Sequence, residues 1–222
     1  MTEPDNDSAA LTILGINLQH RRLLRLRFPR GDGPEHVVLV ANALDAVEGL
    51  SRDFVFTVEL LSDSAIIDLD SVLGKMVTVE LIKDDGTLRF FNGYVFEFSL
   101  VKTDGGSAYY SMVLRPWLAY LHLRSNSVAF HKLTVVELTD IVLGYYGKRD
   151  WTHRIGGANP AVTYICQHNE SDHNLLHRYW EGAGWSYFYE HRADGHALRL
   201  SDDTRVSGAA IDLRVVCFAM SI

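Results

Sequence analysis

Alternation of apolar and polar residues dominates the first half of this sequence, from Leu11 to Leu118. This period of two is typical of β-strands that bury one face. The alternation stops at Asp84-Asp85-Gly86 and again at residues 103–106, and it resumes after each stop. Asp-Gly between alternating segments is a strong hairpin signal, because such turns need positive φ angles. Residues 75–118 are therefore predicted to form a three-stranded meander, with a bulge at Gly93.

The middle strand of this meander is rich in aromatic residues. Its period of two places one set of large side chains on a single face: Leu88, Phe90, Tyr94, Phe96, Phe98 and Leu100. Earlier strands are predicted near residues 11–28, 36–42 and 54–62. Several strands without a clear helix between them indicate a barrel or sandwich, since closing a sheet removes its unpaired edges. We predict a β-barrel over residues 11–125, after a disordered N-terminus over residues 1–10.

Helical signals follow the predicted barrel. Thr134 and Glu137 have the spacing of a capping box, in which each side chain bonds the other residue's amide, so a helix is predicted to begin there. A second helix is predicted over residues 172–181, with Ser171 or Asn169 as its N-cap.

Residues 126–203 are thus predicted to be a small two-helix α+β subdomain. Its aromatic residues could form a stacking platform, but their spacing favours a core or a subunit contact: Tyr179, Trp180, Trp185, Tyr187, Phe188 and Tyr189. Cys166 is predicted to be buried and inert within a strand, and Asp202-Asp203 to form a turn. The fold class is mainly β with an α+β insertion.

Charge and composition narrow the function classes. The 222 residues are 47% apolar and 22% charged, which is ordinary for a globular protein. The formal net charge of −7 argues against nucleic acids and anionic membranes as partners, because both require a basic surface. The N-terminus, MTEPDNDSAA, is acidic and does not have the basic start of a signal peptide. The basic residues at 20–30 alternate with leucines and are interpreted as the polar face of a strand.

The sequence offers one weak metal hypothesis. A metal-dependent hydrolase could use His168, Glu170, His173 and His177, because the last two histidines lie four residues apart on the predicted second helix. However, Asn174 stands where a zinc protease would place its general base. Glycine-rich phosphate loops and a Gly-x-Ser-x-Gly motif are also absent from the sequence. We therefore expect no catalytic residue, no metal and no cofactor.

An ordered series of short motifs runs through most of the chain. It comprises residues 54–62 (FVFTVELLS), 73–75 (LGK), 91–95 (FNGYV), 113–118 (VLRPWL), 170–172 (ESD), 181–184 (EGAG) and 187–191 (YFYEH). Together these motifs resemble the N-terminal, hub-like region of VgrG proteins, the spike-tip family of type VI secretion systems. The series is also similar to the baseplate hub proteins of contractile phage tails. The resemblance covers about residues 11–203.

The resemblance implies a structural role. Members of the VgrG family form homotrimers whose hub regions carry two related β-barrels per chain, so that three chains make a pseudo-sixfold ring on the hexameric Hcp tube. Baseplate proteins would be further partners. The family assembles in the bacterial cytoplasm and is exported by the type VI apparatus. No residue is assigned to partner binding, although the loops at residues 84–86 and 103–106 are candidates by position.

The C-terminal residues depart from the family pattern, and two other functions are kept as alternatives. The ending over residues 209–222 is apolar, and residues 204–222 are interpreted as the truncated start of a second barrel or as a tail outside the family pattern. A phage or prophage baseplate hub protein is the alternative function, and a metal-dependent hydrolase is the third.

Overall fold

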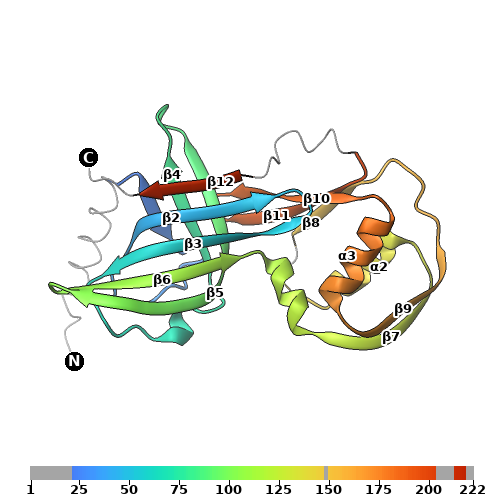
Figure 1. Ribbon diagram of the computed structural model, residues 1–222, viewed down its shortest axis with the longest axis horizontal. Coiled ribbons are helices and arrows are strands. Elements are labelled where there is room, and N and C mark those ends of the chain that lie inside the picture. The colour runs from blue at the N-terminus through green and yellow to red at the C-terminus, as the bar shows by residue number, and fades with distance from the viewer. Residues whose placement is uncertain (1–21, 148–149, 204–212, 219–222) are drawn as a thin grey trace, which may run out of the picture.

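A computed structural model of the chain describes residues 22–147, 150–203 and 213–218. Its main feature is one curled, antiparallel seven-stranded sheet with the order β1-β4-β5-β6-β3-β2-β12 (Figure 1). The strands are β1 (Leu24–Arg27), β2 (Leu39–Gly49), β3 (Arg52–Ser62), β4 (Met76–Ile82), β5 (Leu88–Asp104), β6 (Ser107–Arg115) and β12 (Leu213–Phe218). A short 3-10 helix, η1 (Leu69–Ser71), lies between β3 and β4.

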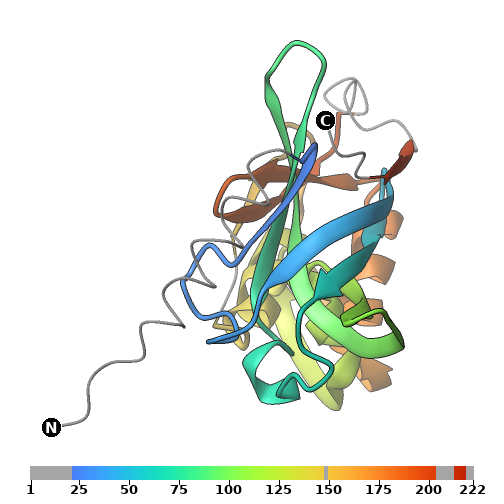
Figure 2. The same cartoon turned by 90° about the vertical axis from the view of Figure 1, so that its left-hand side faces the viewer.

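The predicted hairpins are confirmed. Gly86 has a φ of +78° in the turn between β4 and β5, and Gly105 and Gly106 have φ values of +57° and +87° between β5 and β6. Figure 2 shows the sheet curling strongly, so that its inner face encloses a core. The alternating apolar side chains of β3 fill that core, and Phe54, Phe56, Val58 and Leu60 are completely buried.

Strand β5 differs from the prediction in two ways. Gly93 pairs in register with Val77, and the irregularity in β5 lies further along, between Val95 and Glu97. The predicted position of the bulge is therefore wrong. Gly93 is instead a site of close packing, because a Cβ there would lie 2.9 Å from the Arg115 carbonyl oxygen.

The predicted single aromatic face of β5 is also wrong. Phe91 belongs to the core inside the curled sheet, whereas Tyr94 belongs to a second core outside it. Leu88 and Leu100, at the two ends of the predicted face, are exposed. The reason is that β5 is buried on both faces along its middle, where the second lobe covers the outer face of the sheet.

The second lobe contains the two predicted helices and two small sheets. Its elements are η2 (Trp117–Leu123), β7 (Ser125–Leu133), α2 (Val135–Gly144), β8 (Trp151–Arg154), β9 (Val162–Ser171), α3 (Asp172–Gly182), β10 (Ser186–Arg192) and β11 (Gly195–Ser201). Strands β7 and β9 form an antiparallel pair, and β10-β11-β8 form a mixed sheet. Figure 1 shows α2 and α3 at one end of the large sheet, inside the loop that β7 and β9 make, whereas β10 and β11 lie against β5.

Local capping chemistry defines both helices as predicted. The Thr134 hydroxyl accepts a hydrogen bond from the Glu137 amide, and the Glu137 carboxylate accepts one from the Thr134 amide. Ser171, one of the two predicted caps, accepts a hydrogen bond from the Asn174 amide at the start of α3. The predicted aromatic core is confirmed as well, since Trp180, Trp185 and Tyr187 are buried in the second lobe.

The C-terminal strand completes the large sheet. Strand β12 pairs antiparallel with β2, from Leu213 opposite Glu48 to Phe218 opposite Ala43. This differs from the assignment of residues 204–222 to the start of a second barrel, because β12 extends the first sheet.

Residues 1–21, which include the predicted disordered segment and the beginning of the first predicted strand, lie outside the described residues. Among the described residues, no helix has the length and apolar character needed to cross a bilayer.

Candidate functional site

A half-buried carboxylate joins the large sheet to the second lobe. Asp53, the second residue of β3, accepts hydrogen bonds through its Oδ1 atom from the hydroxyl of Tyr189 at 2.5 Å and of Tyr187 at 3.4 Å. Burial, reinforced by the negative charge of Asp53, raises the pKa of both tyrosine hydroxyls, so they remain protonated donors. Next to this site, the Ser51 amide donates to the Tyr187 carbonyl oxygen at 2.8 Å.

A stack of three histidines lies against the other side of this carboxylate. The ring of His173 stacks on His122 at a centroid distance of 3.6 Å and on His177 at 3.8 Å. The His173 Nε2 atom is 3.7 Å from Asp53 Oδ2. Burial, with a smaller contribution from His173, lowers the pKa of His122, and the same causes lower the pKa of His177 to about 4. The outer two rings are therefore neutral near pH 7, with lone pairs available for hydrogen bonds or a metal ion.

The structure separates the residues of the weak metal hypothesis. His173 and His177 do lie together on α3, but His168 is exposed on β9 and Glu170 pairs with Arg178. The group whose ligand atoms do converge among the described residues is Asp53, His122 and His173, within 4.8 Å of one another. Sequence reasoning missed Asp53 and His122, because they are far from His173 along the chain and belong to no spaced motif.

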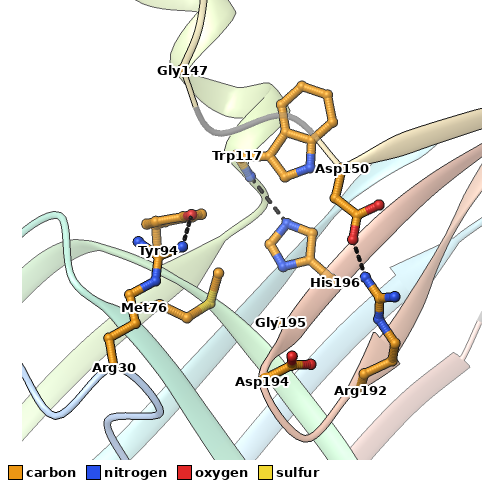
Figure 3. A pocket seen from close by; sticks show the side chains of 10 residues that line it. All are labelled: Arg30, Met76, Tyr94, Trp117, Gly147, Asp150, Arg192, Asp194, Gly195 and His196. Carbon is orange, nitrogen blue, oxygen red and sulfur yellow. Dashed lines mark hydrogen bonds and ion pairs between the residues drawn. The ribbon is translucent and has the colours of Figure 1, made fainter.

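A cavity of about 260 Å³ also opens between the large sheet and the second lobe (Figure 3). His196 reaches into it from β11, and its Nε2 atom accepts a hydrogen bond from the Trp117 amide at 3.2 Å. Burial lowers the pKa of His196 well below 6.5, so the ring is a neutral acceptor. Arg30 donates to the Tyr94 hydroxyl at 3.0 Å.

Two further charged side chains at the cavity pair with each other. Arg192 forms an ion pair with Asp150, and both side chains lie at the rim in Figure 3. Nearby, the Asn92 side chain donates to the Arg192 carbonyl oxygen, which ties β5 to β10. These interactions make the cavity part of the joint between the large sheet and the second lobe.

Three further predictions can be compared with the structure. Cys166 is exposed, so the prediction of a buried thiol is wrong; in β9 the alternate residues Ile165 and Gln167 point inward instead. Asp202 lies in a bend after β11 rather than in a hydrogen-bonded turn, and its carboxylate accepts hydrogen bonds from the Gly156 and Gly157 amides. Arg25 and Arg27 of β1 alternate with the buried Leu24 and Leu26, as predicted, although Arg27 also pairs with the buried Glu80.

The two hairpin ends that were candidates by position are exposed. Residues 84–86 form the tip of the β4–β5 hairpin, which projects from the sheet in Figures 1 and 2. Residues 103–106 form the tip of the β5–β6 hairpin, at the end of the molecule farthest from the second lobe (Figure 1). Leu100 and Val101, near this second tip, are 47% and 64% exposed.

Comparison with known families identifies the fold. The family model described as phage tail baseplate hub (GPD) matches residues 47–219, which include β12 and most of the large sheet. The chain belongs to the phage tail baseplate hub family. The match extends through residues 213–218, so the C-terminal strand is part of the family region.

Curated relatives of this hub protein are spike proteins. The chain is 30% identical to the type VI secretion system spike protein VgrG1b of Pseudomonas aeruginosa and 32% identical to VgrG1c of the same organism, over 83% of its length in each case. It is 27% identical to the spike protein VgrG3 of Vibrio cholerae over 82% of its length. It spans only 24%, 25% and 19% of these three relatives, respectively.

Solved structures share the fold. An Escherichia coli protein, c3393, matches with a TM-score of 0.71 and 20% identity over 82% of this chain and 49% of that chain. It is described as a component of the type VI secretion system with structural similarity to the T4 bacteriophage tail proteins gp27 and gp5. A tail protein from Neisseria meningitidis matches with a TM-score of 0.55 and 17% identity over 81% of this chain and 50% of that chain.

Proposed function

We propose that this chain is a structural hub module of a type VI secretion spike, which assembles as a homotrimer and docks on the Hcp tube. The observation that carries the proposal is the hub family match over residues 47–219, together with relatives that are themselves type VI spike proteins. The partners would be two further copies of the chain, the tube protein and baseplate proteins. Assembly would take place in the bacterial cytoplasm, followed by export through the type VI apparatus.

The described residues support a role in assembly rather than catalysis. The Arg192–Asp150 and Arg178–Glu170 ion pairs lie within the second lobe, so these charged groups are paired internally. One relative, the Vibrio cholerae actin cross-linking toxin VgrG1, is named for a toxic activity, but the present chain covers 16% of that protein. We therefore place no catalytic role in this region.

The ends of the hairpins are the proposed partner-facing surfaces. The tips at residues 84–86 and 103–106 are exposed, and Leu100 and Val101 present apolar area beside the second tip. Exposed apolar side chains that lie together favour protein contacts, because burying them against a partner removes their surface from water. In this arrangement the rigid sheet positions the contacts, and the second lobe supports its outer face.

The homotrimer is tested by the absolute mass of the purified chain, measured by light scattering after size exclusion over a range of concentrations. Because one chain has a mass of 25.0 kDa, the proposal predicts a species of three times that mass. The double variant Leu100→Ser/Val101→Ser should shift the population toward monomer if the β5–β6 end contributes to the contact. A wild-type mass of one chain at every concentration would contradict trimer formation by these residues.

A phage or prophage baseplate hub is the second candidate. It is supported by fold matches to phage-type tail proteins, including a 43 kDa tail protein of prophage MuSo2 from Shewanella oneidensis with a TM-score of 0.55. The genes beside this one distinguish the candidates. Neighbouring type VI sheath and Hcp genes would support the secretion spike, whereas phage head and tail genes would support the phage hub.

A further inference from the structure

Three ligand-bearing side chains converge where the second lobe meets the large sheet. Asp53 comes from the start of β3, His122 from η2 and His173 from the first turn of α3. Each offers one oxygen or nitrogen atom, and these atoms all lie within 4.8 Å of one another. Two imidazoles and one carboxylate are a ligand set that Zn²⁺ and related divalent transition metals bind in proteins.

Neighbouring hydrogen bonds orient the carboxylate toward the histidines. Both tyrosine hydroxyls, from Tyr187 and Tyr189, bind the Oδ1 atom of Asp53. The Oδ2 atom instead faces His173 Nε2 at 3.7 Å, a distance too long for a direct hydrogen bond. Metal-binding carboxylates and histidines are typically held in place by such outer hydrogen bonds, which leave one atom directed at the ion.

The size and exposure of the cluster also fit an ion. With metal–ligand bonds of about 2.1 Å, the ligand atoms of a tetrahedral zinc site lie about 3.4 Å apart, so the three groups need to close by roughly an ångström. The side chains of Asp53 and His173 are only 17% and 12% exposed, which holds them in place. His122 is exposed, so an ion can enter from solvent and the ring can tilt away from its stacked position.

We propose that Asp53, His122 and His173 bind a divalent transition metal ion, with Zn²⁺ as the best fit, and that this ion fastens the second lobe to the large sheet. The three ligands come from three elements that belong to different parts of the fold, so one ion would link β3, η2 and α3. Three protein ligands leave a fourth position, which a water molecule would fill. The proposal is independent of trimer formation and of tube binding.

The test is a titration of the purified full chain, first stripped of metals with a chelator and then dialysed, with ZnCl₂ in a calorimeter. We expect one Zn²⁺ per chain, and we expect thermal unfolding to shift upward once Zn²⁺ is in excess, because an ion that binds only the folded state stabilises it. Titration with CoCl₂ provides a second readout, since the visible absorption of Co²⁺ reports a low-symmetry site with nitrogen and oxygen ligands.

Two variants test the ligand assignment. His122→Gln removes an exposed ligand with little risk to folding, and Asp53→Asn keeps the shape of the side chain that the tyrosines contact. Each should weaken Zn²⁺ binding by at least 100-fold and abolish the thermal shift. Tyr189→Phe should weaken binding by roughly 10- to 100-fold, as expected for a group that orients a ligand.

Exposed histidines elsewhere provide the matched control. His153→Gln and His168→Gln alter histidines on β8 and β9 that are outside the cluster, and they should leave the affinity unchanged. The proposal is overturned if the wild-type chain binds no Zn²⁺, or if the His122→Gln and Asp53→Asn variants bind it as tightly as the wild type. Equal losses in the two control variants would also overturn it, because they would indicate unspecific binding to surface histidines.

Discussion

Replacing Gly93 by alanine should destabilise this protein, although alanine is normally better tolerated than glycine within a strand. A Cβ atom at Gly93 would lie 2.9 Å from the Arg115 carbonyl oxygen, 3.0 Å from Phe54 Cε2 and 3.1 Å from Leu114 Cβ. These neighbours belong to the backbone of β6 and to the core, so none of them can move aside freely. Crowding in a packed core costs about 1–3 kcal/mol.

The stabilising effect of the same substitution is smaller than this cost. Alanine in place of glycine restricts the unfolded chain and contributes about 0.5–1 kcal/mol in favour of folding. With both effects near the middle of their ranges, the net expectation for Gly93→Ala is a loss of about 1 kcal/mol in the free energy of unfolding. For a chain of this size, that corresponds to a melting temperature lower by about 2–4 °C.

Urea unfolding followed by circular dichroism measures this change, and Gly182→Ala is the matched control. Gly182 is the last residue of α3, and a Cβ there meets no atom within 4 Å. Alanine at that position should raise the stability by about 0.4–1 kcal/mol. The reasoning is refuted if Gly93→Ala is as stable as the wild type or more stable, because the close approach of β5 to β6 and the core would then not be restrictive.

Three further predictions concern single side chains. Neutral His196 accepts the Trp117 amide hydrogen bond and has a pKa lowered by burial, so below about pH 6.5 the unfolded chain gains a proton that the folded chain does not. Stability should therefore fall with decreasing pH. In unfolding curves measured between pH 5 and pH 7, His196→Gln should reduce that slope by an amount that approaches about 1.4 kcal/mol per pH unit at the acid end; an unchanged slope would contradict the assignment. Thr139→Val should lower the free energy of unfolding in urea by about 1–3 kcal/mol, because the buried Trp180 indole N–H would lose its acceptor. An unchanged free energy would mean that another group accepts this hydrogen bond. Cys166, which is exposed, should react with a thiol reagent in the native protein at a rate near that of a free thiol, whereas reaction only on unfolding would place it in the interior.

Local signals in the sequence were sufficient for turns and helix ends. The hairpin at Gly86 and the capping box of Thr134 and Glu137 depend on residues within four positions of one another, so their chemistry can be read directly from the chain. The ordered motifs together indicated the family, which no single motif could do.

Features that depend on the packing of distant segments were not predictable in the same way. Period two placed Tyr94 and Phe98 on one face of β5, but they belong to different cores. The second lobe covers the outer face of β5, and the irregularity after Val95 shifts the alternation. The cluster of Asp53, His122 and His173 forms only because β3, η2 and α3 meet in space. The exposure of Cys166 follows from its place on a two-stranded sheet, which buries one face only.

Direct binding to the tube protein tests the central claim that this chain is a hub module of a contractile secretion spike. The measurement is the mass, by light scattering after size exclusion, of a mixture of the chain with hexameric Hcp rings encoded in the same gene neighbourhood. The account predicts a new species in which three chains sit on one ring, and it predicts that Leu100→Ser/Val101→Ser reduces that species. Separate elution of the chain and the ring at all concentrations would contradict the claim.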